Sequence, residues 1–497
     1  MSTVARIILR AAEPRLAAAT AALAAALALA ACTAGPDFRT PDAPSVDRYT
    51  VHGDRIATAS QHTTVGATVD PTWWRAFGTP ILDHLVDDAL AHDQTLAQAT
   101  ASLDAARERA GAARGALWPQ LSFAAVTGRQ KYGVSLFGPS NFKIPPFSYY
   151  TAGPQVSYTL DFAGTTRRTI EARRAYAEFR GHEWQAVRLA LVGQVVGEAI
   201  EISSAESQVA VVGRILDDDR RNLELVRRAR DAGSAALPDV VSAQSQLAHD
   251  QTLLPALEQR RSSAGHALAA LVGRAPAEAP GPDLVLDDWH LPADLPATLP
   301  SQLVRSRPDI RAAESQLHEA SAAVGIATAQ LYPQIVLSAN TTQQALEPAH
   351  LFDAAANAWS FAGGLTAPLF EGGRLRAERR AAIDDYHAAL ADYHQTVLDA
   401  FRQVADVLRA LQHDEAEVTA QRQALRTAVD SLRLARLAYR EGASGILNVL
   451  DAERLAAQAE LGLVQARTRQ LQDTALLYLA QGGGTAVAAA GGRAPQH

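Results

Sequence analysis

The single cysteine of this sequence stands where a lipid-modification reaction would need it. Cys32 closes the apolar segment 16–31, which follows arginines at positions 6, 10 and 15 and ends in Leu-Ala-Ala-Cys. A charged region followed by an apolar one is typical of a secretory signal, and this ending is typical of a bacterial lipoprotein processing site. The alternative is a plain signal peptide that happens to contain a cysteine. Because a lone cysteine cannot form an internal disulfide bond, we expect Cys32 to become an acylated N-terminus. Thr33 follows it rather than Asp, which favours an outer-membrane address.

Residues that could catalyse a reaction do not form a complete motif. His182-Glu183 could begin the helix of a zinc protease, but Ala186 stands where the second histidine is required. The glycine run 482–484 lacks the lysine of a phosphate-binding loop, and the histidines are scattered without ligand spacing. A net charge of −7 gives no reason to expect nucleic-acid binding. We therefore expect no enzymatic activity, no metal site and no cofactor, so energy for any transport would come from a partner protein.

The elements around these residues are arranged in two copies. The segment 225–233 is similar to 434–442, so that Gly233 corresponds to Gly442, 209 residues later. A second pair of motifs, Leu-Trp-Pro-Gln-Leu at 117–121 and Leu-Tyr-Pro-Gln-Ile at 331–335, is 214 residues apart. These offsets are far too long for a solenoid repeat. The sequence therefore predicts a duplicated half-protein with pseudo-twofold units.

Long helices account for most of each copy. The proline-free segments 165–232 and 374–441 have a heptad-like apolar rhythm. At ~1.5 Å per residue, each would form a helix roughly 100 Å long. Each is expected to turn at its glycine and return through a second helix, over 238–271 and 446–479. A further helix, with an interruption, is expected from Pro80 to about position 117. Their apolar stripes require burial against one another.

Between the helices, two segments alternate apolar and polar residues, and we expect them to form β-hairpins at 119–162 and 333–370. The strands of the second hairpin are expected at 334–344 and 359–370. The first would have an aromatic, Gly- and Pro-rich loop at 132–150. Each strand has about the 9–11 residues that a tilted membrane strand requires.

Beyond the signal there is no run of about 18 apolar residues, so strands would have to make any membrane crossing. Four strands cannot close a barrel, since single-chain barrels begin at about eight, and lipid does not tolerate open edges. Three chains would together supply twelve strands.

The predicted organisation combines these parts. It consists of a signal peptide at 1–31, a lipidated irregular arm at 32–75, a first repeat at 76–273, a linker at 274–300, a second repeat at 301–481 with a tip turn at 442–445, and a disordered tail at 482–497. The linker is acidic, contains six prolines and is expected to be free of helix.

Several motifs together are specific enough to indicate a family. They are Gly35-Pro-Asp-Phe38, Trp73-Trp74 with Phe77, the segment Leu299–Glu314, Phe370-Glu-Gly-Gly-Arg-Leu-Arg376, and Tyr439-Arg-Glu-Gly442 followed by Val449-Leu-Asp-Ala452. With Cys32, they resemble the TolC-like outer-membrane factor family, in its NodT-type lipoprotein branch. The resemblance covers essentially the whole mature chain. Arg-Pro-Asp-Ile-Arg at 307–311 is its most specific part.

The resemblance implies a mostly α fold with a small β part, in which duplicated half-units form a long periplasmic α-helical barrel. A homotrimer would add a twelve-strand outer-membrane β-barrel, and the linker and terminal arms would form an equatorial collar. The implied function is the outer-membrane channel of a tripartite efflux system that exports small toxic compounds. Its implied partners are a periplasmic adaptor, an inner-membrane proton-driven pump of the RND type, and outer-membrane lipid.

The family also implies a gate at the periplasmic tip, where the helical turns close like an iris. Carried onto this sequence, Leu447 and Asp451 fall on gate positions, with Asn448 beside Leu447. Asp239 and Tyr439 fall on positions that link neighbouring tip helices. Some members have an arginine in the second tip turn, where this sequence has a serine at 444. An aspartate after a turn is usually a solvated surface residue, but threefold symmetry would make one inward aspartate a ring of three, and such rings favour cations.

Two other functions remain open at this point. A type I protein secretion channel would share the architecture, although the lipoprotein site and the segment 307–311 favour efflux. A periplasmic coiled-coil scaffold without a channel would explain the long helices but not the hairpins.

Overall fold

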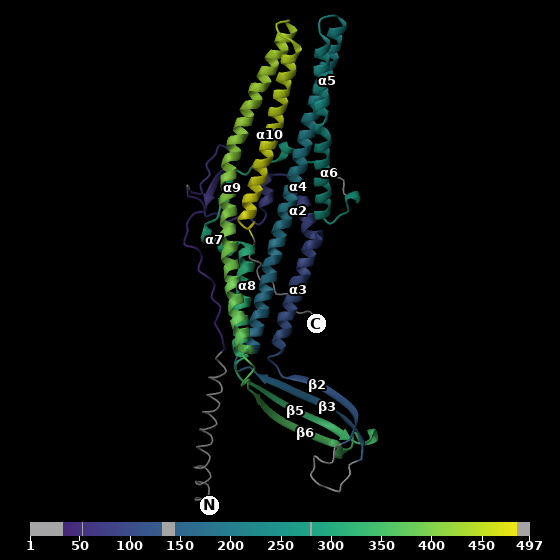
Figure 1. The fold of residues 1–497 in the computed structure, drawn as a ribbon, viewed down its shortest axis with the longest axis vertical. Helices are drawn as coiled ribbons and strands as arrows, with labels where there is room; N and C mark the ends of the chain where they lie inside the picture. The colour runs from purple at the N-terminus through teal and green to yellow at the C-terminus, as the bar shows by residue number, and fades with distance from the viewer. Residues whose placement is uncertain (1–32, 52, 132–144, 279–280, 485–497) are drawn as a thin grey trace, which may run out of the picture. The chain divides into compact units, whose positions relative to one another are not determined.

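The computed structural model describes residues 33–51, 53–131, 145–278 and 281–484. The expected signal peptide, Cys32 and most of the expected tail, from 485, lie outside these ranges. The described chain is mostly helical, with a four-stranded and a two-stranded sheet (Figure 1). It divides into two compact units. Unit 1 falls within Met1–Thr40, Asp104–Phe179 and Ala313–Asp392, and unit 2 within Pro41–Leu103, Arg180–Ala312 and Tyr393–His497.

The sheet of unit 1 joins the hairpins of the two copies. Its strands are β2 (Gln120–Gln130), β3 (Phe147–Leu160), β5 (Gln334–Ala345) and β6 (Asn357–Thr366), in the order β2-β3-β5-β6 with every neighbour antiparallel. The two hairpins meet at β3 and β5, where Val156 lies opposite Ala339. Within the described chain, β2 and β6 each have a strand neighbour on one side only.

Two strand ends differ from the predicted ones by several residues, and β6 also begins two residues early, at Asn357. The prediction of a strand up to 370 was wrong, because β6 ends at Thr366. Pro368 follows closely and has no N–H to donate to a neighbouring strand. The loop predicted at 132–150 was too long, because β3 begins at Phe147. Positions 132–144 of that loop lie outside the described residues.

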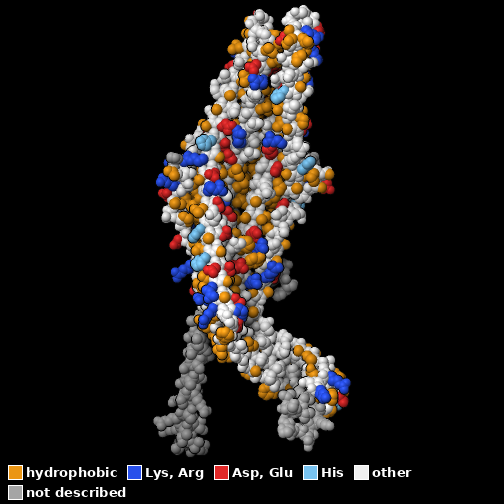
Figure 2. All heavy atoms as spheres, viewed as in Figure 1, with side chains coloured by type: hydrophobic (Ala, Val, Ile, Leu, Met, Phe, Trp, Pro, Cys, Tyr) orange, Lys and Arg blue, Asp and Glu red, His pale blue; other side chains and the backbone are white. Residues whose placement is uncertain are grey.

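The two edge strands carry large apolar side chains that the chain leaves exposed. On β2 these are Leu121 and Phe123, and on β6 they are Trp359, Phe361 and Leu365. In each strand they occupy alternate positions and therefore share one face. On the helices, by contrast, charged side chains of both signs are interspersed in the view of Figure 2. This sheet face is suited to an apolar environment.

The two long helices have the same length. α4 (Thr165–Asp231) and α9 (Arg374–Arg440) each contain 67 residues and begin where the heptad-like segments begin. Each continues from unit 1 into unit 2. No helix in the described ranges is both long enough and apolar enough to span a membrane.

Each long helix ends at the glycine that the repeat aligns. Gly233 and Gly442 have φ of 78° and 71°, a left-handed conformation that favours glycine. The N–H of Ser234 donates to the carbonyl of Ala229 at 2.8 Å, and the N–H of Ala443 donates to that of Ala438 at 2.8 Å. This bond spans five residues and is the mark of a Schellman motif. The same termination therefore occurs in both copies.

The return helices differ between the copies. In the second copy, α10 (Ile446–Ala480) is continuous, close to the range expected. In the first copy, the prediction of one helix over 238–271 was wrong, because α5 (Leu237–Gln251) and α6 (Leu253–Leu271) are separate. Pro255 has no N–H for the carbonyl of Gln251 and its ring crowds that carbonyl, so a continuous helix is broken here.

The arm and the linker are more ordered than the sequence indicated. β1 (His62–Val65) from the arm pairs in parallel with β4 (Asp294–Ala297) from the linker. The other elements are η1 (Trp73–Phe77), α2 (Pro80–His92), α3 (Gln94–Gly115), η3 (Pro276–Glu278), η4 (Leu286–Asp288), α7 (Pro300–Ser306), α8 (Pro308–Ala329), η5 (Pro348–His350) and η6 (Ala354–Ala356). The linker is therefore not free of helical turns. A parallel pair between residues more than 200 positions apart leaves no local pattern, which is why it was not predicted.

Candidate functional site

The tip turns rest on a shared apolar core. Residues of α4, α5 and α10 are buried together there, and side chains of α9 pack against them. The buried members are Leu223, Val226, Val240, Ala243, Ile446, Val449 and Leu450. Because this core includes the helices on both sides of each turn, it fixes the direction in which the tip residues point.

Three of the predicted gate residues lie together on α10, on the face that points away from the apolar tip core. Leu447, Asn448 and Asp451 are exposed, and Leu447 is 54% exposed. Leu447 and Asp451 are one helical turn apart, so they share a face. A large apolar side chain and a carboxylate are therefore displayed side by side, next to the second tip turn.

The charge of Asp451 is partly balanced within its own helix. The Arg454 guanidinium donates to the Asp451 carboxylate at 2.6 Å. Both side chains are largely exposed, and such pairs contribute little to stability. The pair nevertheless places a positive charge within one turn of the predicted ring, which the sequence interpretation did not consider.

The other predicted tip residues stabilise the chain that carries them. The Asp239 carboxylate accepts the N–H of Ala236 at 2.9 Å and so caps the start of α5. Tyr439 packs, partly buried, against the apolar tip core. No hydrogen bond joins Asp239 to Tyr439 in the part of the chain that the structure describes. The hydroxyl of Ser444 is buried in the second turn, without a hydrogen-bond partner among the described residues.

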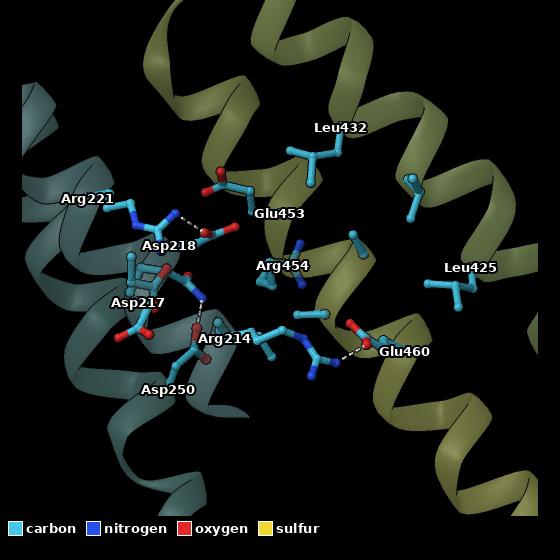
Figure 3. A pocket seen from close by; sticks show the side chains of 16 residues that line it. Arg214, Asp217, Asp218, Arg221, Asp250, Leu425, Leu432, Glu453, Arg454 and Glu460 are labelled. Atoms are coloured by element: carbon cyan, nitrogen blue, oxygen red, sulfur yellow. Dashed lines mark hydrogen bonds and ion pairs between the residues drawn. The ribbon is translucent and has the colours of Figure 1, made fainter. Parts of the chain in front are cut away.

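A charged network below the tip was missed by the sequence analysis. The Arg436 guanidinium of α9 donates to Asp218 of α4 at 2.9 Å and to Glu453 of α10 at 2.7 Å. Glu453 also accepts a hydrogen bond from Asn222 of α4, and Figure 3 shows Glu453 and Asp218 on facing helices. Burial raises the pKa of Glu453, and Arg436 opposes that rise. The network therefore joins the helical hairpins of the two copies. Charged residues are frequent along these helices, so no local signal marked these three.

The segment 307–311 contains a buried arginine that joins three elements. The Arg307 guanidinium forms a two-pronged contact with Asp309, with N–O distances of 2.9 Å to each carboxylate oxygen. It also donates to the carbonyl of Ala480 at 2.7 Å and to the side chain of Gln403 at 2.5 Å. The start of α8, the middle of α9 and the end of α10 are thus joined by one side chain. A planar guanidinium is suited to such multiple contacts.

In unit 1, a second buried arginine holds the described start of the arm. The side chain of Arg168 is 4% exposed. It donates to the carbonyls of Ala34 and Gly35, at 3.2 and 3.3 Å, and pairs with Asp37 at 2.8 Å and Glu171 at 2.7 Å. The residues just after position 32 are therefore fixed to the start of α4.

Comparison with known proteins settles the family. The profile of the outer membrane efflux proteins matches residues 85–274 and 299–483, one match in each copy. The chain belongs to the outer membrane efflux protein family. It is 32% identical to the pyoverdine export outer membrane protein OpmQ of Pseudomonas aeruginosa, over 93% of this chain and 96% of that protein. It is 28% identical to nodulation protein T of Rhizobium leguminosarum bv. viciae, over 93% of this chain and 92% of that protein. The resemblance to the NodT-type branch is thereby confirmed.

Solved structures of outer membrane efflux proteins have the same fold. The outer-membrane channel OprN aligns with a TM-score of 0.84 and 29% identity, over 91% of this chain and 99% of that chain. The predicted fold class, mostly α with a small β part in duplicated halves, is therefore confirmed. The chain is an outer-membrane channel of the efflux type and not an enzyme.

Proposed function

We propose that this chain forms a homotrimer that exports small toxic compounds from the periplasm. It would act with a periplasmic adaptor and an inner-membrane, proton-driven pump of the RND type. Two observations carry the proposal. The chain has two 67-residue helices that end in the same kind of turn, and each edge strand of its four-stranded sheet pairs with one strand among the described residues. This is a fraction of a barrel, and copies of the chain are needed to complete it.

The sheet supports assembly from several copies. A lipid-exposed edge strand would leave backbone N–H and C=O groups without partners, which costs several kcal/mol for each group. Pairing β2 of one copy with β6 of the next would satisfy both edges. Three copies of the four-stranded sheet would give twelve strands, enough to close a barrel. The apolar face formed by residues such as Phe123 and Phe361 would then meet lipid.

The relatives support the proposed substrate class. The chain is 29% identical to a toluene efflux pump protein and to an antibiotic efflux pump protein, both of Pseudomonas putida. The similarity to pyoverdine export proteins adds pyoverdine to the compounds worth testing. These compounds differ widely in chemistry, which supports a channel that leaves selection to the pump.

Deleting the gene tests this proposal. We expect lower resistance to at least one antibiotic, dye, solvent or metal, and recovery when the intact gene is restored. The trimer would be checked by gel mobility of the membrane extract with and without heating. If a broad panel shows no change while a secreted protein accumulates inside the cell, the type I secretion function replaces this one. If the extract contains no oligomer that dissociates on heating, the periplasmic coiled-coil scaffold becomes the favoured function.

We also predict that Cys32 is acylated and becomes the mature N-terminus. Replacing Cys32 with Ser should abolish incorporation of labelled palmitate, because the thiol that accepts the lipid is lost. The contacts of Arg168 support this position, since the chain is fixed to α4 directly after Cys32. The matched control is Thr33→Ser, which should stay labelled. Palmitate labelling that persists in Cys32→Ser would refute the prediction.

A further inference from the structure

The apolar seam of α4 is interrupted by one buried aspartate. Val212 and Val226 are buried, and Asp219 lies seven residues from each of them. Leu216 and Leu223, also buried, occupy the alternate positions of the same heptad pattern. Asp219 is 4% exposed. It therefore stands at a position where a coiled coil places an apolar residue.

The facing helix has an aspartate at the same level. On α5, Asp250 lies seven residues after Ala243 and seven before Leu257, the latter on α6, and all three are buried. Asp219 and Asp250 are close enough for a hydrogen bond between their carboxyl groups. The Gln246 amide donates to the Asp250 carboxyl at 2.7 Å and holds it in place. One layer of this hairpin therefore consists of two acids.

The second hairpin has such a layer as well. On α9, Asp414 is buried between Leu411 and Val418 of the seam. On α10, Asp473 lies seven residues from the buried Ala466, and its carboxyl can hydrogen-bond that of Asp414. The 209-residue offset does not relate the two layers, because it aligns Asp219 with an alanine at 428. Each hairpin thus has its own pair, at its own level.

In both pairs one oxygen lacks a partner unless a proton is present. Oδ2 of Asp219 and Oδ2 of Asp414 are buried, and neither has a hydrogen-bond partner among the residues that the structure describes. An ionised carboxylate can only accept hydrogen bonds, so two facing carboxylates repel each other. One proton between them gives an O–H group that donates to the opposite carboxylate. The missing partner in each layer is therefore a proton.

The surroundings favour the protonated form near neutral pH. Burial and then Asp250 raise the pKa of Asp219 to about 7, and burial and then Asp473 raise the pKa of Asp414 to about 7. A cavity of about 370 Å³ beside the first pair gives protons access to it (Figure 3). Other charged groups lining that cavity are Arg214, Asp217, Asp218, Arg221, Glu453, Arg454 and Glu460.

Charged neighbours compensate only in part. Near the first pair, Arg436 is already bound by Asp218 and Glu453. Near the second pair, Arg469 is paired with Glu417, and Glu415 accepts hydrogen bonds from Ser60 and Gln470. In these contacts, each nearby arginine is thus shared with another acidic residue, and none pairs with an aspartate pair alone.

We propose that each helical hairpin binds a proton in its seam, between Asp219 and Asp250 and between Asp414 and Asp473, and that losing it loosens the return helix from the long helix. The site takes a proton as its ligand and does not depend on which compound is exported. Because each hairpin ends in a tip turn, the same protons would regulate how easily the tip opens.

The direction of the pH effect follows from the raised pKa values. A carboxyl exposed by opening of the seam has a pKa of about 3.9, whereas the seam holds its proton up to about pH 7. The protonated seam is therefore fully stable below about pH 4 and loses stability as the pH rises to about 7. Above that range, both carboxyls are ionised and the stability stays at its lower level.

Hydrogen exchange of the purified full chain in lipid nanodiscs tests the proposal. After correction for intrinsic exchange, protection of α5 and α10 should fall at least about tenfold between pH 5.5 and 8, since one linked proton changes the opening constant up to tenfold per pH unit. In Asp219→Asn the fall should disappear from α5, and in Asp414→Asn from α10, because an amide donates to the facing carboxylate at every pH. The matched controls are Asp231→Asn and Asp430→Asn, which change exposed aspartates of the same two long helices away from the two pairs.

A second measurement needs no variant. The infrared spectrum of the unmodified channel should show a protonated carboxyl band that disappears as the pH rises through about 7. The proposal is overturned if no such band titrates between pH 5 and 8. It is also overturned if the Asn variants keep the pH dependence of the controls. A channel that fails the resistance test could still pass these measurements, so the two proposals fail separately.

Discussion

Replacing Arg307 with Ala should markedly lower the thermal stability of the purified channel. Arg307 is buried, and its guanidinium is bound by Asp309, Gln403 and the carbonyl of Ala480. The alanine would leave these groups without their donor and open a space between α8, α9 and α10. Losing several charge-assisted hydrogen bonds from a buried site should lower the free energy of unfolding by about 3 kcal/mol. Circular dichroism during heating would measure the shift in Tm.

Two further variants make the Arg307 prediction specific. Arg305→Ala removes an exposed arginine two positions earlier and should leave Tm nearly unchanged. Arg307→Lys keeps the charge but cannot form the two-pronged contact with Asp309, so its Tm should fall between those of the parent and Arg307→Ala. If Arg307→Ala melts at the same temperature as Arg305→Ala, the contacts of Arg307 do not stabilise the fold.

Replacing Leu447 with Ala should raise the basal conductance of the channel in planar bilayers by severalfold. Three copies of this exposed leucine would form an apolar ring at the narrowest point of the proposed trimer, and hydrophobic constrictions oppose the passage of ions. Asp451→Ala should instead reduce the preference for cations, because it removes three carboxylates from the neighbouring ring. It should also weaken block by divalent or trivalent cations added from the periplasmic side. Single-channel recordings in salt gradients would measure both effects.

The chain offers a close control for the aspartate. Asp430 is exposed on α9 and pairs with Arg433 three residues later, just as Asp451 pairs with Arg454. Asp430→Ala should therefore leave conductance and ion preference unchanged. If Leu447→Ala and Asp451→Ala both behave like Asp430→Ala while other tip substitutions open the channel, the gate lies elsewhere.

The sequence by itself determined the features that depend on local periodicity. Seven-residue spacing without proline predicted α4 and α9 from their first residues, because an apolar stripe is a property of one helix. Gly233 and Gly442 marked the tip turns, since glycine adopts a left-handed conformation at low cost. Alternation predicted the hairpins, and the repeat predicted that they come in two copies. Leu447 and Asp451 could be assigned to one helix face from their spacing alone.

Only the tertiary structure decided which distant residues meet. The pairing of β1 with β4 and the contacts of Arg436 across three helices join segments far apart in the chain, and no local pattern encodes them. Asp219 shows where this limit lies. Its position in an apolar heptad row was visible in the sequence, but a lone acid in a seam is costly unless it has a partner. The partner, Asp250, lies on another helix. The turn at Gly233 brings the two carboxyls together, so only the folded structure identifies the pair.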